Sequence, residues 1–265
     1  MLNKLLVLAV SASLNAGKAI LEVYKNEKIE AELKDDNSPL TLADKNAHLE
    51  IIKILETTNI PVLSEEGRSI AYEERKNWEY LWIVDPLDGT KEFINRNGDF
   101  TVNIALIKNQ KPILGVVYVP VSGQIYFSIK GEGAYTAIIQ NNELFNSDYK
   151  KYTKIPNCAK RNSYIAVASR SHMNSETKDY ISNLENSKGK IELQSRGSSL
   201  KICMVAEGEA DIYPRFGPTM EWDTAAGHAI AIEAGCTFTQ ADEQTPFIYN
   251  KENLLNPYFI VKRDI

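Results

Sequence analysis

The sequence predicts a mixed protein, α+β in its first half and α/β in its second half. Apolar residues keep helical spacing near the start, and short β-rich runs separated by turn residues follow between residues 80 and 130. After residue 155, helical segments alternate with strands. Paired helices, an antiparallel-type sheet and a second α/β layer are therefore expected in that order.

The first twenty residues predict an amphipathic helix. MLNKLLVLAVSASLNAGKAI also has the lysine, short apolar run and small residues of a secretory signal. However, its apolar positions keep helical spacing through any plausible cleavage point, at Leu2, Leu5, Leu6, Ala9, Ala12, Ala16, Ile20 and Val23. The apolar run is judged too short for the roughly 20 residues of a membrane span.

A second helix is expected within residues 34–58, after a polar loop, with Leu49, Ile52 and Leu55 on one face. The chain then reads as a short strand and turn followed by four β-rich runs. These segments are PVLSEEG, YLWIVDPLDGT, FTVNIALI, GVVYVP and IYFSI.

The second half begins with the expected strand and loop IAVASRSH. A polar helix from Ser175, a helix and strand within 198–214, a helix at 222–235 ended by Gly235, and a strand pair near Cys236 and Phe259 follow. The polar segment 140–157 is interpreted as the boundary between two halves of the chain. We therefore expect an N-terminal half of residues 1–150, carrying most metal ligands, and a C-terminal half of residues 151–265.

Charge and cysteine content narrow the classes of function. A net charge of −5 argues against nucleic-acid binding, which needs a basic surface for phosphates. An anionic substrate would then need local positive charge, most simply from a bound metal. The cysteines, Cys158, Cys203 and Cys236, are far apart, which suggests neither a zinc site nor a disulfide framework. We expect reduced thiols in a cytoplasmic protein.

The stretch WIVDPLDGTKEF at 82–93 carries the strongest chemical signal. An apolar strand delivers Asp85 and Asp88, whose carboxylates suit a hard cation such as Mg2+. Pro86 biases Asp85 toward an extended conformation at the strand end, and the Leu87 carbonyl is placed to face the metal.

The same stretch is suited to phosphate. Gly89 lets the backbone approach a ligand, and a helix starting near Thr90 would offer the unpaired amides of both residues to an anion. A D-x-x-D pair on its own is more commonly a helix or turn cap, so the motif needs support from the rest of the chain.

Two further acids occupy places comparable to that of the Asp85/Asp88 pair, at a strand end or a helix start: Glu65 follows a strand, and Asp223 opens the 222–235 helix. Taken singly, Asp223 is most simply a first-turn aspartate and Glu65 a solvated turn residue. The shared placement of Glu65, the Asp85/Asp88 pair and Asp223 suggests one site at the ends of packed elements. Asp44, early in the second helix, is by itself an ordinary helix acid.

Four motifs in order across nearly the entire chain resemble the inositol monophosphatase-like superfamily of metal-dependent, lithium-sensitive phosphatases. They are SPLTLAD, LSEEG, DPLDGTKEF and EWDTAAGHA. The longer segments EFINRNGDFTVNIALI, GSSLK and YPRFGPTMEWDTAAGHA are more similar to the CysQ-type 3'(2'),5'-bisphosphate nucleotidases of that superfamily. The resemblance implies a layered αβαβα sandwich with the site between the halves.

The resemblance also implies a metal centre and a mechanism. The matching ligands are Glu65, Asp85, the Leu87 carbonyl, Asp88 and Asp223. One Mg2+ would activate the attacking water and a second would stabilise the leaving ribose oxygen, with a weaker third ion near Glu65. Asp44 and Thr90 would orient and deprotonate that water, so the implied catalytic residues are Asp44, Thr90 and Glu65.

Substrate contacts follow from the same resemblance. The Gly89 and Thr90 amides would hold the reacting phosphate, and Lys201 and Arg215 would suit a second phosphate. The full implied substrate set is Glu65, Leu87, Asp88, Gly89, Thr90, His172, Ser198, Lys201, Arg215 and Asp223. Without the resemblance, Lys201 reads equally well as a solvated helix lysine and His172 as a loop histidine.

The implied activity is removal of the 3'-phosphate from adenosine 3',5'-bisphosphate, with action on 3'-phosphoadenosine 5'-phosphosulfate also expected. Two alternatives stay open: hydrolysis of inositol phosphates or fructose 1,6-bisphosphate, and a nucleotide- or metal-sensing binding protein without turnover. The expected partner is a small nucleotide and not a nucleic acid. We expect a cytoplasmic monomer or homodimer, whose only membrane contact would be peripheral, on the inner face of the cytoplasmic membrane.

Overall fold

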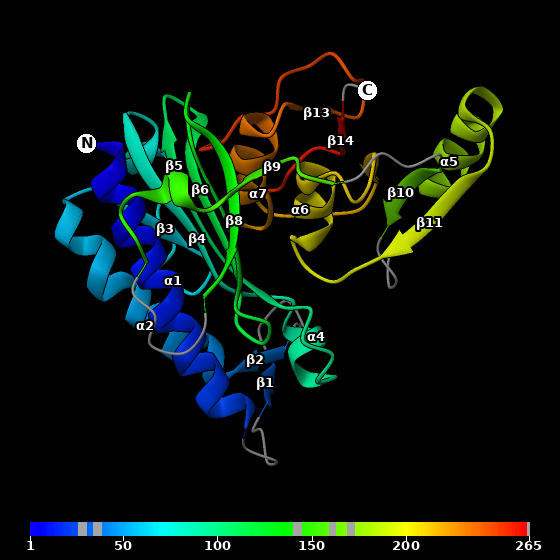
Figure 1. Cartoon of the computed structure of the whole chain (residues 1–265). Helices are drawn as coiled ribbons and strands as arrows, with labels where there is room; N and C mark the ends of the chain where they lie inside the picture. The colour runs from blue at the N-terminus through cyan, green and yellow to red at the C-terminus, as the bar shows by residue number, and fades with distance from the viewer. Residues whose placement is uncertain (26–30, 34–38, 140–144, 159–162, 169–172, 264–265) are drawn as a thin grey trace.

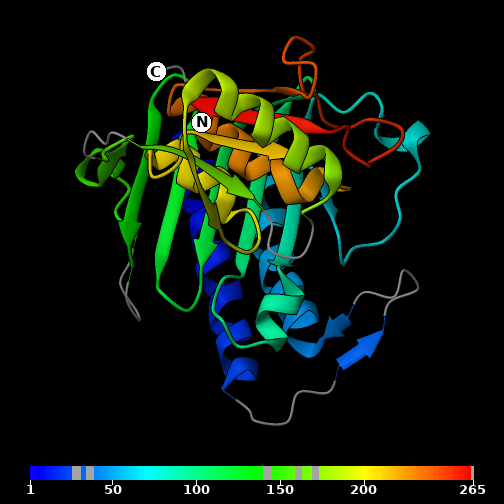
Figure 2. The ribbon, with the colours of Figure 1, turned by 90° about the vertical axis from the view of Figure 1, so that its right-hand side faces the viewer.

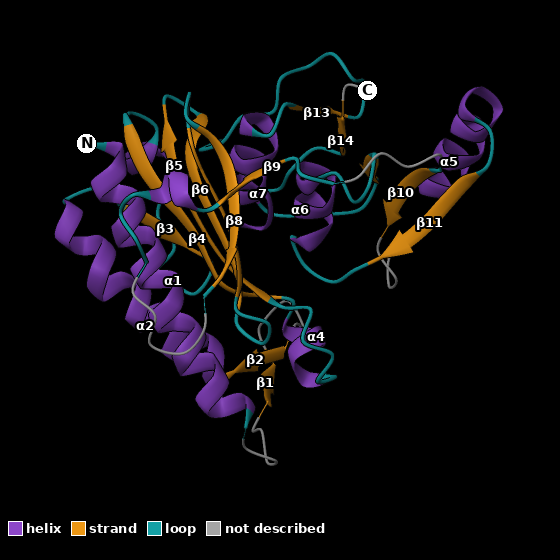
Figure 3. Cartoon of the chain, in the orientation of Figure 1, coloured by secondary structure: helices purple, strands orange, loops and turns teal. Residues whose placement is uncertain are grey.

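The computed structural model describes residues 1–25, 31–33, 39–139, 145–158, 163–168 and 173–263. Its elements stack in five layers: two helices, a seven-stranded sheet, two helices, a five-stranded sheet and one outer helix (Figure 1). The layered αβαβα sandwich expected from the sequence is confirmed; Figure 3 shows how helices and strands alternate from layer to layer.

The seven-stranded sheet has the order β3-β4-β5-β6-β7-β8-β9. All neighbouring pairs are antiparallel except β3 and β4, which are parallel, so the sheet is mixed. Its strands are Val62–Ser64, Tyr80–Asp88, Thr101–Lys108, Lys111–Val119, Gln124–Ile129, Gly133–Ile138 and Thr153–Ile155. Its last strand lies after residue 150, and the division into 1–150 and 151–265 stays a prediction.

One face of this sheet is covered by α1 (Leu2–Tyr24) and α2 (Leu42–Leu55), which pack against each other and against β4, β5 and β6. The amphipathic first helix is confirmed, since its apolar stripe from Leu5 to Ile20 is buried. The expected face of α2 is partly wrong: Leu55 is buried as expected, but Leu49 is 64% exposed. The helix buries Ala43, Ala47 and Ile51 together with Leu55, and its small alanines let it pack closely on α1.

Helix α1 also corrects the expectation that the N-terminal run is too short for a membrane span. The helix has 23 residues and a mean hydropathy of 1.5 over its best 18-residue window, so by length and composition alone it could cross a membrane. Buried core helices and signal sequences share this property. Here the helix packs on the sheet as a core element (Figure 2).

The second sheet has the order β11-β10-β12-β14-β13, with β10 parallel to β11 and β12 and the β14 pairings antiparallel. Its strands are Tyr164–Ala168, Ile191–Ser195, Ile212–Arg215, Cys236–Gln240 and Phe259–Arg263 for β10 to β14. Helix α5 (Ser175–Lys188) covers its outer face. The strands and helices expected here are confirmed within a few residues.

Helices α6 (Leu200–Glu207) and α7 (Glu221–Glu233) lie between the two sheets. Helix α7 approaches β6 at Gly115, where a Cβ atom would lie 2.3 Å from the Ala226 carbonyl oxygen. Only glycine allows this approach. The first turn of α7 is thereby held beside the end of β4, which is where the acidic motif lies.

Shorter elements complete the chain. A two-stranded hairpin pairs β1 with β2, and two short α-helices, α3 and α4, flank β4 in sequence. Their bounds, with those of the 3-10 helices η1 and η2, are Ala31–Leu33, Pro39–Thr41, Tyr72–Arg75, Thr90–Ile94, Glu56–Thr58 and Tyr149–Lys151.

Candidate active site

The end of β4 places two carboxylates of the acidic motif. The pairing of β4 with β5 shifts register between Asp85 and Asp88, where Pro86 supplies no backbone donor. Asp85 is 1% exposed, and its Oδ1 accepts the Leu87 amide over 3.1 Å. The expected position of Asp85 near the end of the strand is confirmed, and its side chain is buried.

The turn after β4 begins the short helix α4 as expected. Gly89 has φ 92°, a left-handed conformation that glycine adopts without strain, and the helix starts at Thr90. Thr90 Oγ1 donates to the Leu87 carbonyl over 3.5 Å. The contact between Thr90 and Asp44, and the phosphate role of the two amides, stay predictions.

Glu65 and Asp44 come from the two elements beside β4. Because β3 runs parallel to β4 with Ser64 opposite Val84, the next residue, Glu65, emerges beside the acidic motif, and its amide donates to the Val84 carbonyl over 3.1 Å. Asp44 lies buried in the first turn of α2. The order of the elements thus brings both acids toward Asp85.

Asp223 comes from the first turn of α7. Its Oδ2 accepts the Met220 amide over 2.9 Å, which satisfies one of the unpaired amides at the helix start. The first-turn position expected for Asp223 is therefore confirmed, and the same side chain also lines the cavity that contains Asp88.

The carboxylates act on one another electrostatically. Burial, followed by the charges of Glu65, Asp88, Asp223 and Asp44, raises the pKa of Asp85 well above its usual range. Burial, then the charge of Asp88, does the same to the pKa of Asp223, although the nearby Arg215 opposes it. Such a cluster is favourable when a cation neutralises it, so its oxygen donors fit Mg2+ chemically.

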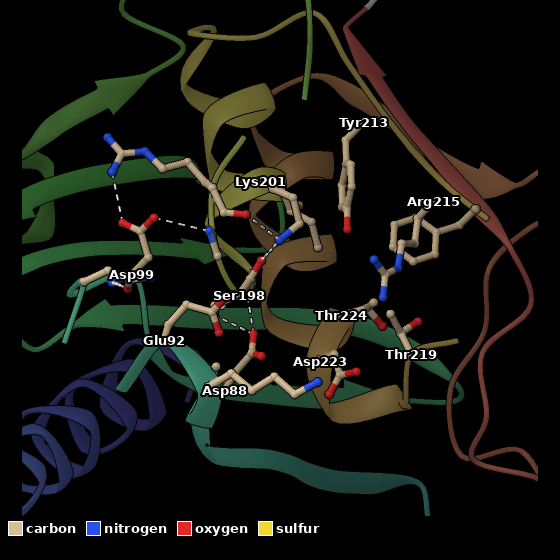
Figure 4. Close-up of a pocket in the computed structure, with 18 residues that line it drawn as sticks. Asp88, Glu92, Asp99, Ser198, Lys201, Tyr213, Arg215, Thr219, Asp223 and Thr224 are labelled. Carbon is tan, nitrogen blue, oxygen red and sulfur yellow. Dashed lines mark hydrogen bonds and ion pairs between the residues drawn. The ribbon is translucent and has the colours of Figure 1, made fainter. Parts of the chain in front are cut away.

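As they stand in the described segments of the chain, no three His, Cys, Asp or Glu side chains converge closely enough to hold an ion. Asp88 Oδ2 instead accepts Ser198 Oγ over 2.6 Å and the Ser199 amide over 2.7 Å (Figure 4). Asn103 Nδ2 adds a weaker bond to the same oxygen at 3.3 Å. The loop that joins β11 of the second sheet to α6 therefore donates hydrogen bonds to a candidate metal ligand.

Lys201 lies in this cavity and is not the solvated lysine that its helix position also allowed. It is 5% exposed, and its ammonium donates to the Ser198 carbonyl over 2.6 Å and to the Arg196 carbonyl over 3.1 Å. Burial lowers the pKa of Lys201 to about 8, although the charge of Asp88 opposes this. Its contact with a second phosphate stays a prediction.

Arg215 ends β12 and points into the same cavity (Figure 4). One guanidinium nitrogen donates to the Pro218 carbonyl over 3.0 Å. Its Nε is buried and has no hydrogen-bond partner among the described residues. Of the nucleotide contacts expected from the sequence, Ser198, Lys201 and Arg215 thus line one cavity of about 160 Å3, and His172 lies outside the described residues.

Several cavity residues were missed by the sequence analysis. Asp99 accepts Arg196 Nη1 over 3.0 Å and the Gly197 amide over 3.3 Å, and so holds the loop before α6 from the β4–β5 connection. Glu92, in α4, also lines the cavity, and burial raises its pKa. Both lie in segments that carry the family resemblance, but each residue alone carries no motif.

These features define the class of protein: a layered sandwich whose acidic strand end faces a cation-lined cavity. The chain belongs to the inositol monophosphatase family, which matches residues 1–259. Enzymes of this family are typically Mg2+-dependent.

Individual relatives are similar over nearly the whole chain. The 3'(2'),5'-bisphosphate nucleotidase CysQ of Salmonella typhimurium is 46% identical over 93% of this chain and 95% of its own. The protein of the same name from Escherichia coli K12 is 45% identical over the same shares. The crystal structure of CysQ from Bacteroides thetaiotaomicron, a bacterial member of the family, matches with a TM-score of 0.91 and 51% identity, covering 99% of this chain and 98% of that one.

Proposed function

We propose that this chain is a Mg2+-dependent phosphomonoesterase that converts adenosine 3',5'-bisphosphate to AMP and phosphate. The similarity to CysQ relatives supports the substrate class. The observation that carries the proposal is the buried Arg215 Nε, which lacks a partner among the described residues in a cavity that also holds Asp88, Asp223 and Lys201. A monophosphate ester needs only the acidic side of this cavity, whereas a bisphosphate also uses the cations.

Glu65, Asp85, the Leu87 carbonyl, Asp88 and Asp223 would hold two Mg2+ ions, with a weaker third near Glu65. When bound, the metal would neutralise the phosphate charge and activate the attacking water. Thr90 would orient that water and accept its proton while passing its own hydroxyl proton to Asp44, and the Gly89 and Thr90 amides would hold the transferred phosphate. Lys201 and Arg215 would bind the 5'-phosphate, and 3'-phosphoadenosine 5'-phosphosulfate offers a similar charge at that position.

Location and assembly belong to the same proposal. We expect a cytoplasmic enzyme that clears a by-product of sulfate activation. Monomer and homodimer remain alternatives, as does peripheral contact with the inner face of the cytoplasmic membrane.

The proposal is tested by phosphate release from adenosine 3',5'-bisphosphate, inositol 1-phosphate and fructose 1,6-bisphosphate in parallel. Each assay is run with Mg2+, with EDTA and with Mg2+ plus Li+. We expect preference for the nucleotide, loss of turnover in EDTA and suppression by Li+. Preference for another ester would overturn the roles of Ser198, Lys201 and Arg215, and tight nucleotide binding without turnover would favour a sensor.

A further inference from the structure

We propose that Arg75 is a positioning residue for the metal site, acting through the loop 250–256 on the first turn of α7, which carries Asp223. The inference rests on the metal site of the proposed function and assigns a role to the segment 66–77, in which the sequence shows no motif. Arg75 is the last residue of the short helix α3 in this segment.

The first contact is the burial of the Arg75 guanidinium against the loop. Arg75 is 2% exposed. Its Nη1 donates to Asn250 Oδ1 over 2.8 Å and to the Lys251 carbonyl over 2.7 Å, and its Nη2 donates to the Glu252 carbonyl over 2.9 Å. Asn250 Nδ2 donates back to the Arg75 carbonyl over 2.8 Å. The planar guanidinium satisfies three acceptors at once, which fixes one arrangement of the loop.

The second contact joins the same loop residues to α7. Glu221 is fully buried, and its carboxylate accepts the Asn250 amide over 2.6 Å, the Lys251 amide over 2.9 Å and the Lys251 ammonium over 2.6 Å. Asn250 and Lys251 are therefore held by Arg75 on one side and by Glu221 on the other. Glu221 is the first residue of α7 and lies two positions before Asp223.

The third contact lies further along the loop. Asn256 Nδ2 donates to the Met220 carbonyl over 2.6 Å and to Thr224 Oγ1 over 3.0 Å, so it binds residues on both sides of Asp223. Met220 is also the residue whose amide is bonded to Asp223 Oδ2. The loop thus sets the position of the helix turn and, through Met220, the direction of the Asp223 side chain.

The Arg75 side chain is bonded to the loop and not to Asp223, so its effect on a bound ion passes through the loop and α7. Groups that orient metal ligands without touching the metal commonly change affinity 10- to 100-fold when they are removed. We expect loss of the Arg75 contacts to weaken the ion held by Asp85, Asp88 and Asp223, with a smaller effect on the KM of a nucleotide substrate.

The test uses the full chain and measures Mn2+ binding by electron paramagnetic resonance, without substrate. Arg75→Lys keeps the positive charge but loses the fork that reaches three acceptors. We expect this variant, at a temperature where its near-UV circular dichroism matches wild type, to bind Mn2+ about tenfold more weakly. The Mg2+ concentration for half-maximal activity should rise by a similar factor.

Two control variants separate positioning from general stability. Arg68→Met removes an exposed ion pair with Glu74 in the same segment. Arg263→Met removes a partly buried arginine, bonded to the Gly208 carbonyl and paired with Asp211, at a distance in sequence from the α7 turn. Both controls should bind Mn2+ with wild-type affinity, even if Arg263→Met lowers Tm as much as Arg75→Lys.

Glu221→Gln weakens the contacts of the same loop from the α7 side. If Arg75→Lys does not fold, this variant tests whether the loop positions Asp223. Folded variants at both positions that bind Mn2+ like wild type would overturn the inference and leave the proposed function standing. Equal weakening in Arg263→Met would also overturn it, since stability alone would then explain the effect. A wild-type protein that binds no Mn2+ would instead overturn the proposed metal site and the inference together.

Discussion

The amide of Ser199 donates to Asp88 Oδ2 over 2.7 Å, and this bond joins the loop before α6 to the end of β4. Ser198 Oγ reaches the same oxygen over 2.6 Å, and its own position depends on a left-handed φ of 52°. The Asp88 carboxylate is therefore oriented by residues more than a hundred positions later in the chain. Metal binding and the conformation of this loop should change together.

Asp88→Asn should reduce Mg2+-dependent turnover by at least about 100-fold, because an amide replaces a charged metal ligand. Ser198→Ala removes one donor to Asp88 and leaves the Ser199 amide, so a milder loss of about tenfold is expected. The measurement is kcat as a function of Mg2+ concentration for both variants. Turnover of Asp88→Asn within a few-fold of wild type would show that Asp88 is not a metal ligand.

Mg2+ should stabilise the protein more at pH 8 than at pH 6. The folded pKa of Asp85 is raised, so the folded protein without metal binds more protons than the unfolded chain between about pH 4 and that raised value. Stability without metal therefore falls as pH rises through the folded pKa, and Mg2+ offsets the repulsion. Thermal unfolding with EDTA or Mg2+ at the two pH values measures this, and an equal Tm shift at both would contradict it.

Asp85→Asn should raise the Tm of the metal-free protein at pH 8, because a neutral amide replaces a buried charge that faces four other carboxylates. The same variant should lose most of the Mg2+-dependent shift in Tm. Differential scanning calorimetry with EDTA and with Mg2+ compares it with wild type. A variant that is less stable in EDTA at pH 8 would argue that Asp85 contributes mainly through its bond with the Leu87 amide.

Arg215→Met should raise the KM for adenosine 3',5'-bisphosphate about 10- to 100-fold, the range expected for losing a charge-assisted hydrogen bond. The KM for adenosine 3'-phosphate, which has no 5'-phosphate, should change less than about threefold. Arg196→Met is the matched control, since its guanidinium pairs with Asp99 at another region of the cavity wall. Equal effects on the KM values of the two nucleotides would show that Arg215 does not bind the second phosphate.

His228 should make the fold sensitive to acid. Its ring stacks on Phe238 at 4.1 Å and its Nδ1 is bonded to Tyr249 Oη over 2.9 Å, and burial lowers its pKa to about 3. Because the unfolded histidine titrates near 6.5, its contribution is complete above that pH and is lost as pH falls toward 3. Between pH 7 and pH 5 the loss should be about 2 kcal/mol.

The check compares urea unfolding of wild type and His228→Phe at pH 7 and pH 5. The variant should be less stable at pH 7, since Tyr249 loses its hydrogen bond with His228 and keeps only the longer one to Thr224, but should lose less stability on acidification. Parallel losses in the two proteins would show that other groups control the acid response.

Local pattern was sufficient to predict most elements, because the strands from β4 to β7 are short apolar runs separated by turn residues. It was misleading at α2, where Leu49 and Ile52 outweigh Ala47 on any hydrophobicity scale. The observed face uses Ala43 and Ala47, since the close contact with α1 favours small side chains. Which stripe of a helix is buried depends on the partner surface, and that surface is not encoded in the local sequence.

Some residues of the candidate site could be predicted from the sequence and others could not. Asp85, Asp88 and Gly89 could be predicted, because the strand, the turn and the helix start are encoded within a few residues. The bond between Arg75 and Asn250 joins residues 175 positions apart, and the bond between Asp99 and Arg196 joins residues 97 positions apart. Such pairs arise from the stacking of the two sheets, so neither partner carries a local signal.

Helix α7 packs on β4 to β8, on the face opposite α1 and α2. A ribosome releases β4, β5 and β6, which end at Asp88, Lys108 and Val119, more than a hundred residues before α7 begins at Glu221. The growing polypeptide must therefore carry one bare apolar sheet face, including Leu81, Ala105 and Val117, until the helix emerges. The same helix that covers this face carries Asp223, so a nascent chain buries its apolar sheet face and gains its last candidate metal ligand together.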